Sequence, residues 1–419
     1  MSVRGHRLPR GPGRLRRLVR GCCIWTVIGL APAFVSAQAP LTLRAAVERA
    51  SVDGGDISRA RIDTVSSAAL VLGARSWPNP QLITGYTQDV PRYHVALEFP
   101  LDPTFLRRLR IGAAAAGHLA SRRQWQSTLA LTRWQVESAY ARARLEEARA
   151  SLSRATWQAT DTLLTMTRLR RDEGDASDLD VDVAMVEAIQ FASMYSADSL
   201  QAELAVLEVQ RLVGLGSDQR RVILVDSLAT LVRDALATDT SSRSGGLPAA
   251  AARATVDARA LEVRLARRRW WPVPSVTVGF DTHDPSGTGN TPLPMVGVSV
   301  PLPTFTRFGA GVQLAQAAEA RARVDLAVLE RETEGSFVQA RQTLKSAEAR
   351  LVALRGSLDA SRRIAERALL AYREGAAALP YVLQVQRSVR DAMVQLIGAE
   401  ATALSAAAQI RYLLTPTPP

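Results

Sequence analysis

The chain has 419 residues, of which 47% are hydrophobic, 5% aromatic and 22% charged, a composition far too apolar for a disordered protein. Seven arginines and no acidic residue fall within residues 1–20, so removing this segment lowers the formal net charge from +12 to 12 − 7 = +5. A nucleic-acid-binding surface should be clustered on the folded part of the chain, and the sequence therefore argues against a nucleic-acid partner.

Residues 1–37 have the pattern of a secretory signal peptide. The arginine-rich start leads into an apolar run at 21–34, which is too short to span a bilayer, and small residues follow it. We expect cleavage after Ala37 or Ala39. Both cysteines of the chain lie in the signal, so the mature chain is expected to have no disulfide, no zinc–cysteine cluster and no cysteine nucleophile.

The remaining chain contains two copies of one unit. Residues 77–86 (WPNPQLITGY) recur as 271–280 (WPVPSVTVGF), and the Glu-Gly pair at 173–174 recurs at 374–375. Because several landmarks keep the same order in both copies, a chance match is improbable. We expect a first repeat at 38–214, an inter-repeat linker or equatorial region at 215–247, and a second repeat at 248–419.

Each repeat contains the same predicted helices in the same order. Helical patterns cover about 57–76, 106–171 and 177–213 in the first repeat, and about 249–269, 308–373 and 380–414 in the second. Gly174 and Gly375 follow the long helices, as glycine commonly does at a helix C-terminus. A helix of about 65 residues is roughly 100 Å long, which is enough to cross the periplasm and more than a compact enzyme needs.

Two short segments with period-two alternation precede each long helix. In the first repeat, Tyr93, Val95, Leu97 and Phe99 alternate with His94, Ala96 and Glu98; in the second, Val276, Val278 and Phe280 alternate with Thr277, Gly279 and Asp281. Such strands fit a transmembrane β-barrel with Glu98 and Asp281 in its lumen, and a soluble sheet with one buried face is the alternative. Four strands cannot close a barrel, so membrane insertion would require oligomerisation, and three copies would supply twelve strands.

Heptad spacing runs along the long helices. In the second repeat, ten of the eleven a/d positions from Phe337 to Tyr372 and all ten from Val382 to Leu413 are apolar or aromatic. In the first repeat, the expected contact positions are Leu145, Ala148, Leu152, Ala155, Ala159, Thr162, Met166 and Leu169. A 3.5-residue period sustained over this length requires helix partners. The short helix before each strand pair is expected to stack end to end with the second long helix.

The chain resembles the TolC-type outer-membrane efflux proteins. The resemblance rests on residues 41–50 (LTLRAAVERA), the WPxP segments at 77–80 and 271–274, the segments 99–101 and 300–302, and the duplicated strand-and-helix layout. It implies a mainly α-helical fold with a small transmembrane β part, in which a homotrimer forms a twelve-stranded outer-membrane β-barrel continuous with a periplasmic α-helical barrel. The chain length resembles that of the metal-efflux branch among others.

The resemblance also implies a function. It implies a passive exit duct of a tripartite efflux or type I secretion system, located in the cell outer membrane and extending into the periplasm. The expected partners are two further copies of the chain, outer-membrane lipid, a periplasmic adaptor protein and an inner-membrane RND or ABC pump.

In this family the turns of the helical hairpins form the periplasmic gate and the adaptor contact. The first turn is acidic, with Asp172, Glu173, Asp175, Asp178 and Asp180. Helix-end electrostatics is the alternative explanation of these acids, and both can hold. The second turn contributes Arg373, Glu374, Tyr381 and Gln384. Family members often carry aspartates where Tyr381 and Gln384 stand, so Asp180 is the better candidate for a carboxylate constriction.

A soluble periplasmic coiled-coil adaptor or scaffold is the competing interpretation. An adaptor needs a compact β-domain and an inner-membrane anchor, whereas the sequence offers four short strands. Phosphate-loop, nucleophile-elbow and HExxH motifs are absent from the sequence, and its four histidines lack metal-ligand spacing. We therefore expect no enzymatic activity, no cofactor and no metal site. Trp77 and Trp271 are expected either at the membrane interface or capping the helix–strand junction.

Overall fold

The computed structural model describes residues 40–89, 91–102, 104–216, 222–239, 246–269, 272–282, 292–302, 304 and 309–416. The expected signal peptide, Trp271 and residues 240–245 of the expected inter-repeat region lie outside the described residues. Residues 38–419 form one compact unit. Within the described part of the chain, no helix is both long enough and apolar enough to cross a membrane.

All six predicted helices are present, with ends within two residues of those expected. The first repeat contains β1 (Pro40–Leu41), α1 (Leu43–Asp53), α2 (Gly55–Arg75), β2 (Gln81–Tyr86), β3 (Tyr93–Pro100), α3 (Thr104–Asp172) and α4 (Asp178–Leu212). The second contains α6 (Leu247–Arg268), β5 (Ser275–Thr282), β6 (Leu293–Ser299), α7 (Gly309–Arg373) and α8 (Leu379–Leu413). Four elements were not predicted: α1, the parallel pair β1 and β4 (Ile223–Leu224), and α5 (Leu228–Leu236).

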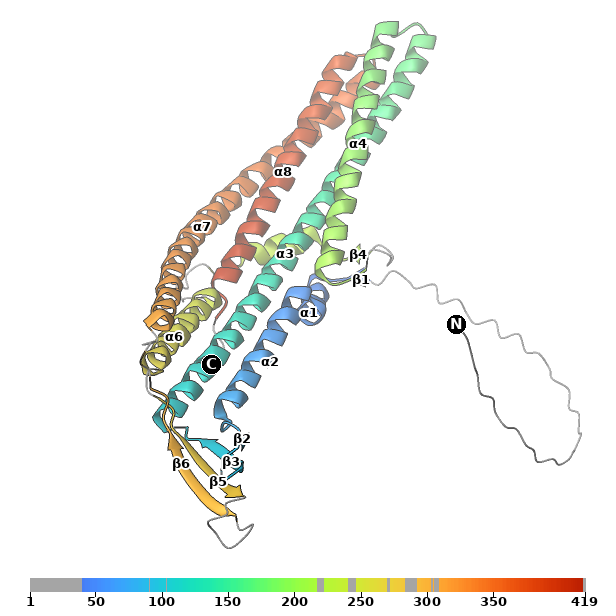
Figure 1. The fold of residues 1–419 in the computed structure, drawn as a ribbon. Coiled ribbons are helices and arrows are strands. Elements are labelled where there is room, and N and C mark those ends of the chain that lie inside the picture. Colours follow the sequence, from blue (N-terminus) through green and yellow to red (C-terminus); the bar gives the residue numbers. More distant parts are fainter. Residues whose placement is uncertain are drawn as a thin grey trace, which may run out of the picture. The chain divides into compact units, whose positions relative to one another are not determined.

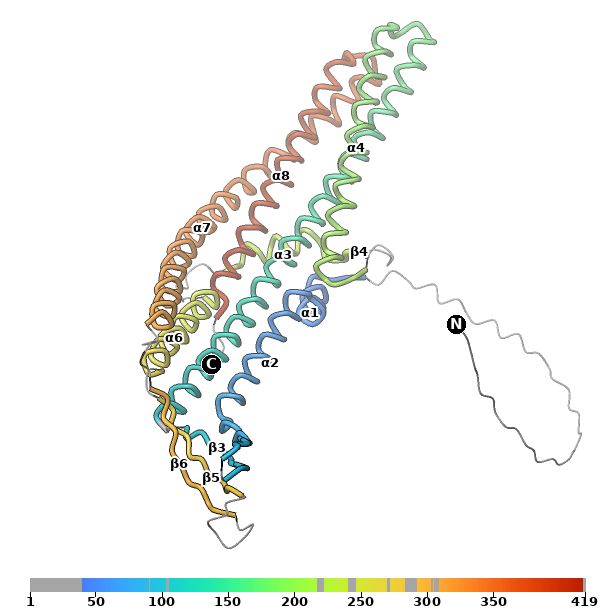
Figure 2. Tube along the Cα trace, viewed as in Figure 1, coloured from blue at the N-terminus to red at the C-terminus, as the bar shows by residue number. Residues whose placement is uncertain are grey.

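The strands and the turns of the helical hairpins lie at opposite ends of this unit. The α3–α4 and α7–α8 hairpins run away from the sheet, and α2 and α6 lie along the half nearer the sheet (Figures 1 and 2). The short helices continue the line of the second long helices: Gly246, just before α6, lies against the carbonyl of Leu413 in α8. A Cβ on Gly214, just after α4, would lie 3.3 Å from the carbonyl oxygen of Asp53, the last residue of α1.

The four longer strands form one antiparallel sheet in the order β2-β3-β5-β6, which joins the two repeats through β3 and β5. The register places Leu82, Leu97, Val278 and Val296 across from one another on one face. Between 42% and 75% of each of these side chains is exposed. The opposite face contains the buried side chains Ala96 and Ser275. The expected alternation is therefore confirmed, and the apolar face is the uncovered one.

The predicted heptad contacts of α7 and α8 are confirmed over most of their length. Ala340, Leu344, Ala347, Leu351 and Leu358 in α7, and Val382, Ala399, Ala403, Ala406 and Ile410 in α8, are all buried. Their packing gives the main core at mid-height and a second cluster of buried apolar residues near the hairpin turns.

The predicted register of α3 is wrong by one residue beyond Leu152. The buried positions are Ser153, Thr160, Leu163, Leu164 and Thr167, whereas Leu169 is 59% exposed. All of them except Leu164 lie one residue past an expected contact. The hydroxyls of Thr160 and Thr167 donate to carbonyl oxygens four residues earlier, each at 2.9 Å. A hydroxyl satisfied in this way can be buried, so counting only apolar residues misplaces the stripe.

Candidate functional site

The same turn ends the first long helix of each repeat. Gly174 and Gly375 adopt the left-handed conformation, with φ of +86° and +75°. The N–H of Asp175 donates to the carbonyl of Arg170 at 2.8 Å, and the N–H of Ala376 donates to that of Ala371 at 2.7 Å. These bonds close the helix C-termini in the way that a left-handed glycine permits. The two hairpin tips therefore share one backbone design.

Several of the acidic residues at the first tip stabilise helix ends. Ser177 caps α4, and Asp180 accepts hydrogen bonds from the Ser177 backbone N–H at 3.0 Å and from its hydroxyl at 2.7 Å, which makes a capping box. Arg171 forms an ion pair of 2.5 Å with Asp172, and its guanidinium lies 3.9 Å from Asp178. The hydrogen bond and charge of Asp172 raise the pKa of Arg171. Helix-end electrostatics thus accounts for Asp172, Asp178 and Asp180.

The other charged residues predicted at the tips remain exposed. Within the described residues, Glu173 and Asp175 form no ion pair, and neither does Glu374 of the second tip. Arg373, Glu374, Tyr381 and Gln384 are all exposed. Within the described residues, no hydrogen bond or ion pair joins the acids of the first tip to these four residues.

A contact that the sequence did not predict joins the two tips. Nη1 of Arg170 donates to the carbonyl of Tyr372 at 2.9 Å, and the guanidinium lies 4.9 Å from the centre of the Tyr372 ring. The Tyr372 hydroxyl lies 2.9 Å from Oγ1 of Thr167. Tyr372 occupies a predicted heptad position, and an aromatic hydroxyl among alanines and leucines was the available signal for a polar contact there.

A second polar contact lies one step further from the tips. The guanidinium of Arg387 in α8 binds the carboxylate of Glu187 in α4, with a distance of 2.7 Å between Nε and Oε1. Only 5% of the Glu187 side chain is exposed, whereas 55% of Arg387 is exposed. The hydrogen bond to Glu187 raises the pKa of Arg387. The tips of the two repeats are therefore joined by two arginines, one on α3 and one on α8.

Glu98 and Asp281 lie on the polar face of the sheet, as predicted, but toward opposite ends of it. The hydroxyl of Ser275 donates to Glu98, and Asp281 lies 2.8 Å from Nδ1 of His94. Each contact crosses from β3 to β5, so the two repeats are joined here as well.

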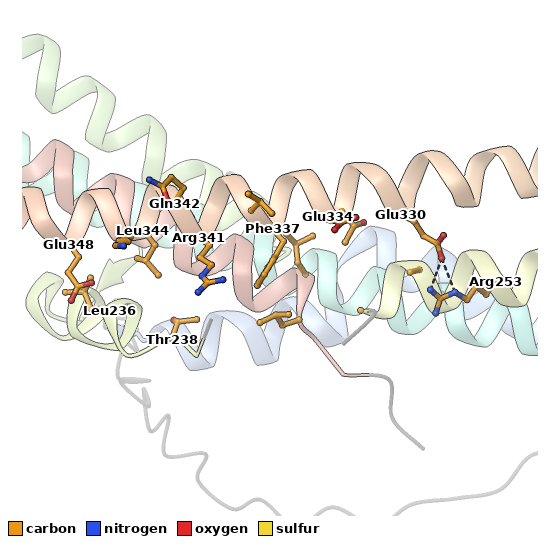
Figure 3. A pocket seen from close by; sticks show the side chains of 17 residues that line it. Leu236, Thr238, Arg253, Glu330, Glu334, Phe337, Arg341, Gln342, Leu344 and Glu348 are labelled. Carbon is orange, nitrogen blue, oxygen red and sulfur yellow. Dashed lines mark hydrogen bonds and ion pairs between the residues drawn. The ribbon is translucent and has the colours of Figure 1, made fainter. Parts of the chain in front are cut away.

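A cavity of about 920 Å³ lies at mid-height, between the ends of α5 and α8, the start of α6 and the middle of α7 (Figure 3). Arg253 and Glu330 form an ion pair of 2.7 Å at one end, and Arg341, Lys345 and Glu348 line the remainder. Its walls carry both signs of charge beside apolar side chains. None of the predicted site residues lines it.

The second repeat is similar in sequence to a known protein family. Residues 249–415 match the family model described as "Outer membrane efflux protein". By sequence, the chain matches none of the proteins of curated function at a significant level. The match covers the second repeat, in which the strand pair and the α7–α8 hairpin lie.

Solved structures extend the similarity over both repeats. The outer membrane protein VceC from Vibrio cholerae shares 16% identity at a TM-score of 0.71, over 89% of this chain and 95% of that chain. The CmeC outer membrane channel of Campylobacter jejuni shares 14% identity at a TM-score of 0.73, over 88% and 85%. The MtrE outer membrane channel of Neisseria gonorrhoeae shares 16% identity at a TM-score of 0.66, over 89% and 88%.

The second repeat thus matches the outer membrane efflux protein family, and the fold of the solved channels continues through the first repeat. These findings confirm the TolC-type resemblance and the mainly helical fold class.

Proposed function

We propose that three copies of this chain form a passive exit duct in the outer membrane. The duct would serve a tripartite efflux or type I secretion system, in which a periplasmic adaptor links it to an inner-membrane RND or ABC pump. One observation carries this proposal: a four-stranded sheet with an uncovered apolar face and two open edges is continuous with long helical hairpins.

The sheet has the properties of one third of a barrel wall. Val296 and Val298 are 75% and 70% exposed, and Leu82 is 66% exposed on the same face. Among the described residues, β2 and β6 each have a partner strand on one side only. Unpaired strand edges cost several kcal/mol per backbone group in lipid, so the sheet requires neighbours that close it. Three copies of four strands give twelve, a number within the range of outer-membrane barrels.

The helices carry matching unpartnered stripes. On α4, Val186, Leu200 and Leu207 are 52%, 54% and 48% exposed at multiples of seven residues. On α7, Val338 and Val352 are 58% and 71% exposed, and they too are separated by a multiple of seven residues. Heptad stripes require a helix partner. Because the two stripes lie on different helices, packing α7 of one copy on α4 of the next is a head-to-tail contact, the kind that forms a ring when the rotation between copies closes.

The repeat boundaries follow the same architecture. We assign 1–37 to the signal peptide, 38–214 and 248–419 to the two repeats, and 215–247 to an equatorial region that contains β4 and α5. The C-terminal end of α8 lies close to the start of α6 at Gly246, which supports a wall in which the short helices continue the long ones.

The gate is assigned to the hairpin tips. Three copies of Asp172, Glu173, Asp175, Asp178 and Asp180 would form a negative ring, and Arg373, Glu374, Tyr381 and Gln384 would complete the surface that contacts the adaptor. Asp180 belongs to the capping box of α4, and a place in the constriction is compatible with that role. Glu98 and Asp281 would face the barrel lumen, because they lie on the face opposite the exposed apolar residues.

Cell fractionation followed by planar-bilayer recording tests the proposal. We expect the protein in the outer-membrane fraction, and we expect the purified oligomer to produce stepwise ion conductance. Recovery from the soluble periplasm without conductance would contradict the duct and favour the coiled-coil adaptor or scaffold instead.

A further inference from the structure

A groove lined by arginines lies where the helices meet the sheet. Its walls are Phe105, Arg108 and Leu109 from the start of α3, and Arg264, Arg267 and Arg268 from the end of α6. It encloses about 720 Å³. These helix ends directly follow β3 and precede β5 (Figure 1). The groove therefore lies at the helical border of the sheet.

The four arginines of this groove lack anionic partners. Within the described residues, none of them forms an ion pair or a side-chain hydrogen bond, and all four are exposed. Their neighbour Arg110 differs, because it binds Asp102 at 2.7 Å and donates to the carbonyl of Ala74. Four like charges in one groove repel one another, so an anion that binds there would relieve a cost built into the fold.

Residues around the groove mark a boundary between apolar and polar surroundings. Leu302 and Leu101, just past the ends of β6 and β3, are 74% and 45% exposed. Trp77, just before β2, is 60% exposed, and the guanidinium of Arg107 lies 5.2 Å from the centre of its ring. Exposed tryptophans and arginines with long apolar stems are typical of the level of lipid headgroups.

We propose that this groove binds the phosphate of an anionic phospholipid from the periplasmic leaflet of the outer membrane. Guanidinium groups pair with phosphate oxygens in a bidentate way, and basic pockets at a membrane surface select anionic headgroups. Leu109 and Phe105 supply the apolar side of the groove, and the uncovered face of the sheet provides the surface for the acyl chains. This inference rests on the proposed insertion of the sheet in the outer membrane.

Native mass spectrometry of the intact oligomer tests the inference. The protein is reconstituted in nanodiscs of equal parts phosphatidylglycerol and phosphatidylethanolamine, and the lipids that it retains on release are counted. We expect the wild type to retain phosphatidylglycerol preferentially. Arg264→Gln with Arg267→Gln should lower this preference about 25-fold, at about fivefold for each arginine. Arg264→Lys with Arg267→Lys should lower it less, because charge remains while the bidentate geometry is lost.

The control variant loses the same number of positive charges at positions far from the sheet. Arg363 and Arg367 are exposed on α7 toward the hairpin tips, and changing both to glutamine should leave the lipid preference unchanged. Equal retention of both lipids by the wild type, or an unchanged preference in the Arg264→Gln/Arg267→Gln variant, would overturn the inference. It would also be overturned if millimolar inorganic phosphate bound the lipid-free oligomer and also displaced phosphatidylglycerol from the reconstituted oligomer. The same holds if the Arg264→Gln/Arg267→Gln variant altered only the ion selectivity of the pore.

The outcome is separable from that of the proposed function. A wild-type oligomer that inserts and conducts but shows no lipid preference contradicts only the groove assignment. A wild type that neither inserts nor conducts contradicts the duct itself.

Discussion

Arg170 and Tyr372 connect the hairpin tips of the two repeats. The Arg170 guanidinium lies over the Tyr372 ring and also donates to the Tyr372 carbonyl at 2.9 Å, so one side chain of α3 makes two contacts with the last turn of α7. Tyr372 is 3% exposed, and its hydroxyl is satisfied by Thr167. Any movement of one tip away from the other must break these contacts first.

Loss of this connection should loosen the gate. Arg170→Ala removes both contacts, and we expect a higher single-channel conductance or open probability in planar bilayers. Arg168→Ala is the matched control, because Arg168 has no ion pair or hydrogen bond within the described residues and is exposed. Equal behaviour of the two variants would show that the contact does not restrain the tips.

Asp180 should influence ion selectivity through its charge. Asp180→Asn removes three charges from the expected ring and should reduce cation preference, as measured by reversal potentials in asymmetric salt. Ser177→Ala removes the hydroxyl from the same capping box but keeps the carboxylate, so it should lower helix stability by about 1 kcal/mol without changing selectivity. If both variants changed selectivity alike, capping rather than charge would be responsible.

Tyr140 should give the protein an alkaline limit of stability. The side chain is fully buried, and its hydroxyl donates to the carbonyl of Leu41 at 2.9 Å. Burial raises the pKa of Tyr140 to about 12, above the ordinary value of about 10. The folded state therefore prefers the neutral phenol, and this contribution is fully present below pH 10 and lost as the pH rises toward 12.

Thermal unfolding between pH 9 and pH 12 checks this expectation. Tyr140→Phe should lower stability at neutral pH by about 1 kcal/mol, because the Leu41 carbonyl loses one of its two donors and the Asp226 N–H loses its acceptor. It should also flatten the alkaline decline. Tyr381→Phe, at a site 52% exposed, should leave both the stability and the decline unchanged. If the stability of Tyr140→Phe fell as steeply at alkaline pH as that of the wild type, the fall would come from groups other than Tyr140.

Gly279 should be required for β5 to pair closely with β3 in the sheet. A Cβ at this position would lie 2.7 Å from the Cβ of Ala96 on β3 and closer still to the Val95 carbonyl, so β3 and β5 would have to separate. Gly279→Ala should therefore reduce the yield of assembled oligomer in the outer membrane, as measured by gel mobility without heating. On β6, Gly297→Ala should be tolerated, because its nearest neighbour, the Cβ of Thr277, is 3.9 Å away.

The sequence predicted the long helices and the two-faced strands because their signals are local and repeated. Apolar spacing identified the α7 contacts, including Leu344 and Leu351, since there the buried residues are also the apolar ones. In α3 the same reasoning failed, because Thr160 and Thr167 are buried with their hydroxyls bonded to their own helix. Periodicity cannot distinguish such a threonine from an exposed one.

The positions of the hairpin turns were predictable, but the contacts that join them were not. Gly174 and Gly375 identified the hairpin turns correctly. The pairs Arg170–Tyr372 and Glu187–Arg387 join residues roughly half the chain apart, and only the packing of one repeat on the other brings them together. The parallel pairing of β1 with β4 was also missed, because two-residue strands have no periodicity to detect.

Disulfide trapping of the sheet edges tests most directly whether three chains share one barrel. The mature chain is expected to lack cysteine, so cysteines can be introduced in pairs along β2 and β6, such as Thr84→Cys with Val296→Cys, in several registers. After oxidation in intact outer membranes, we expect at least one pair to give a ladder of one, two and three linked chains that stops at three. Single chains in every register, or a ladder that continues beyond three, would contradict a closed trimeric duct.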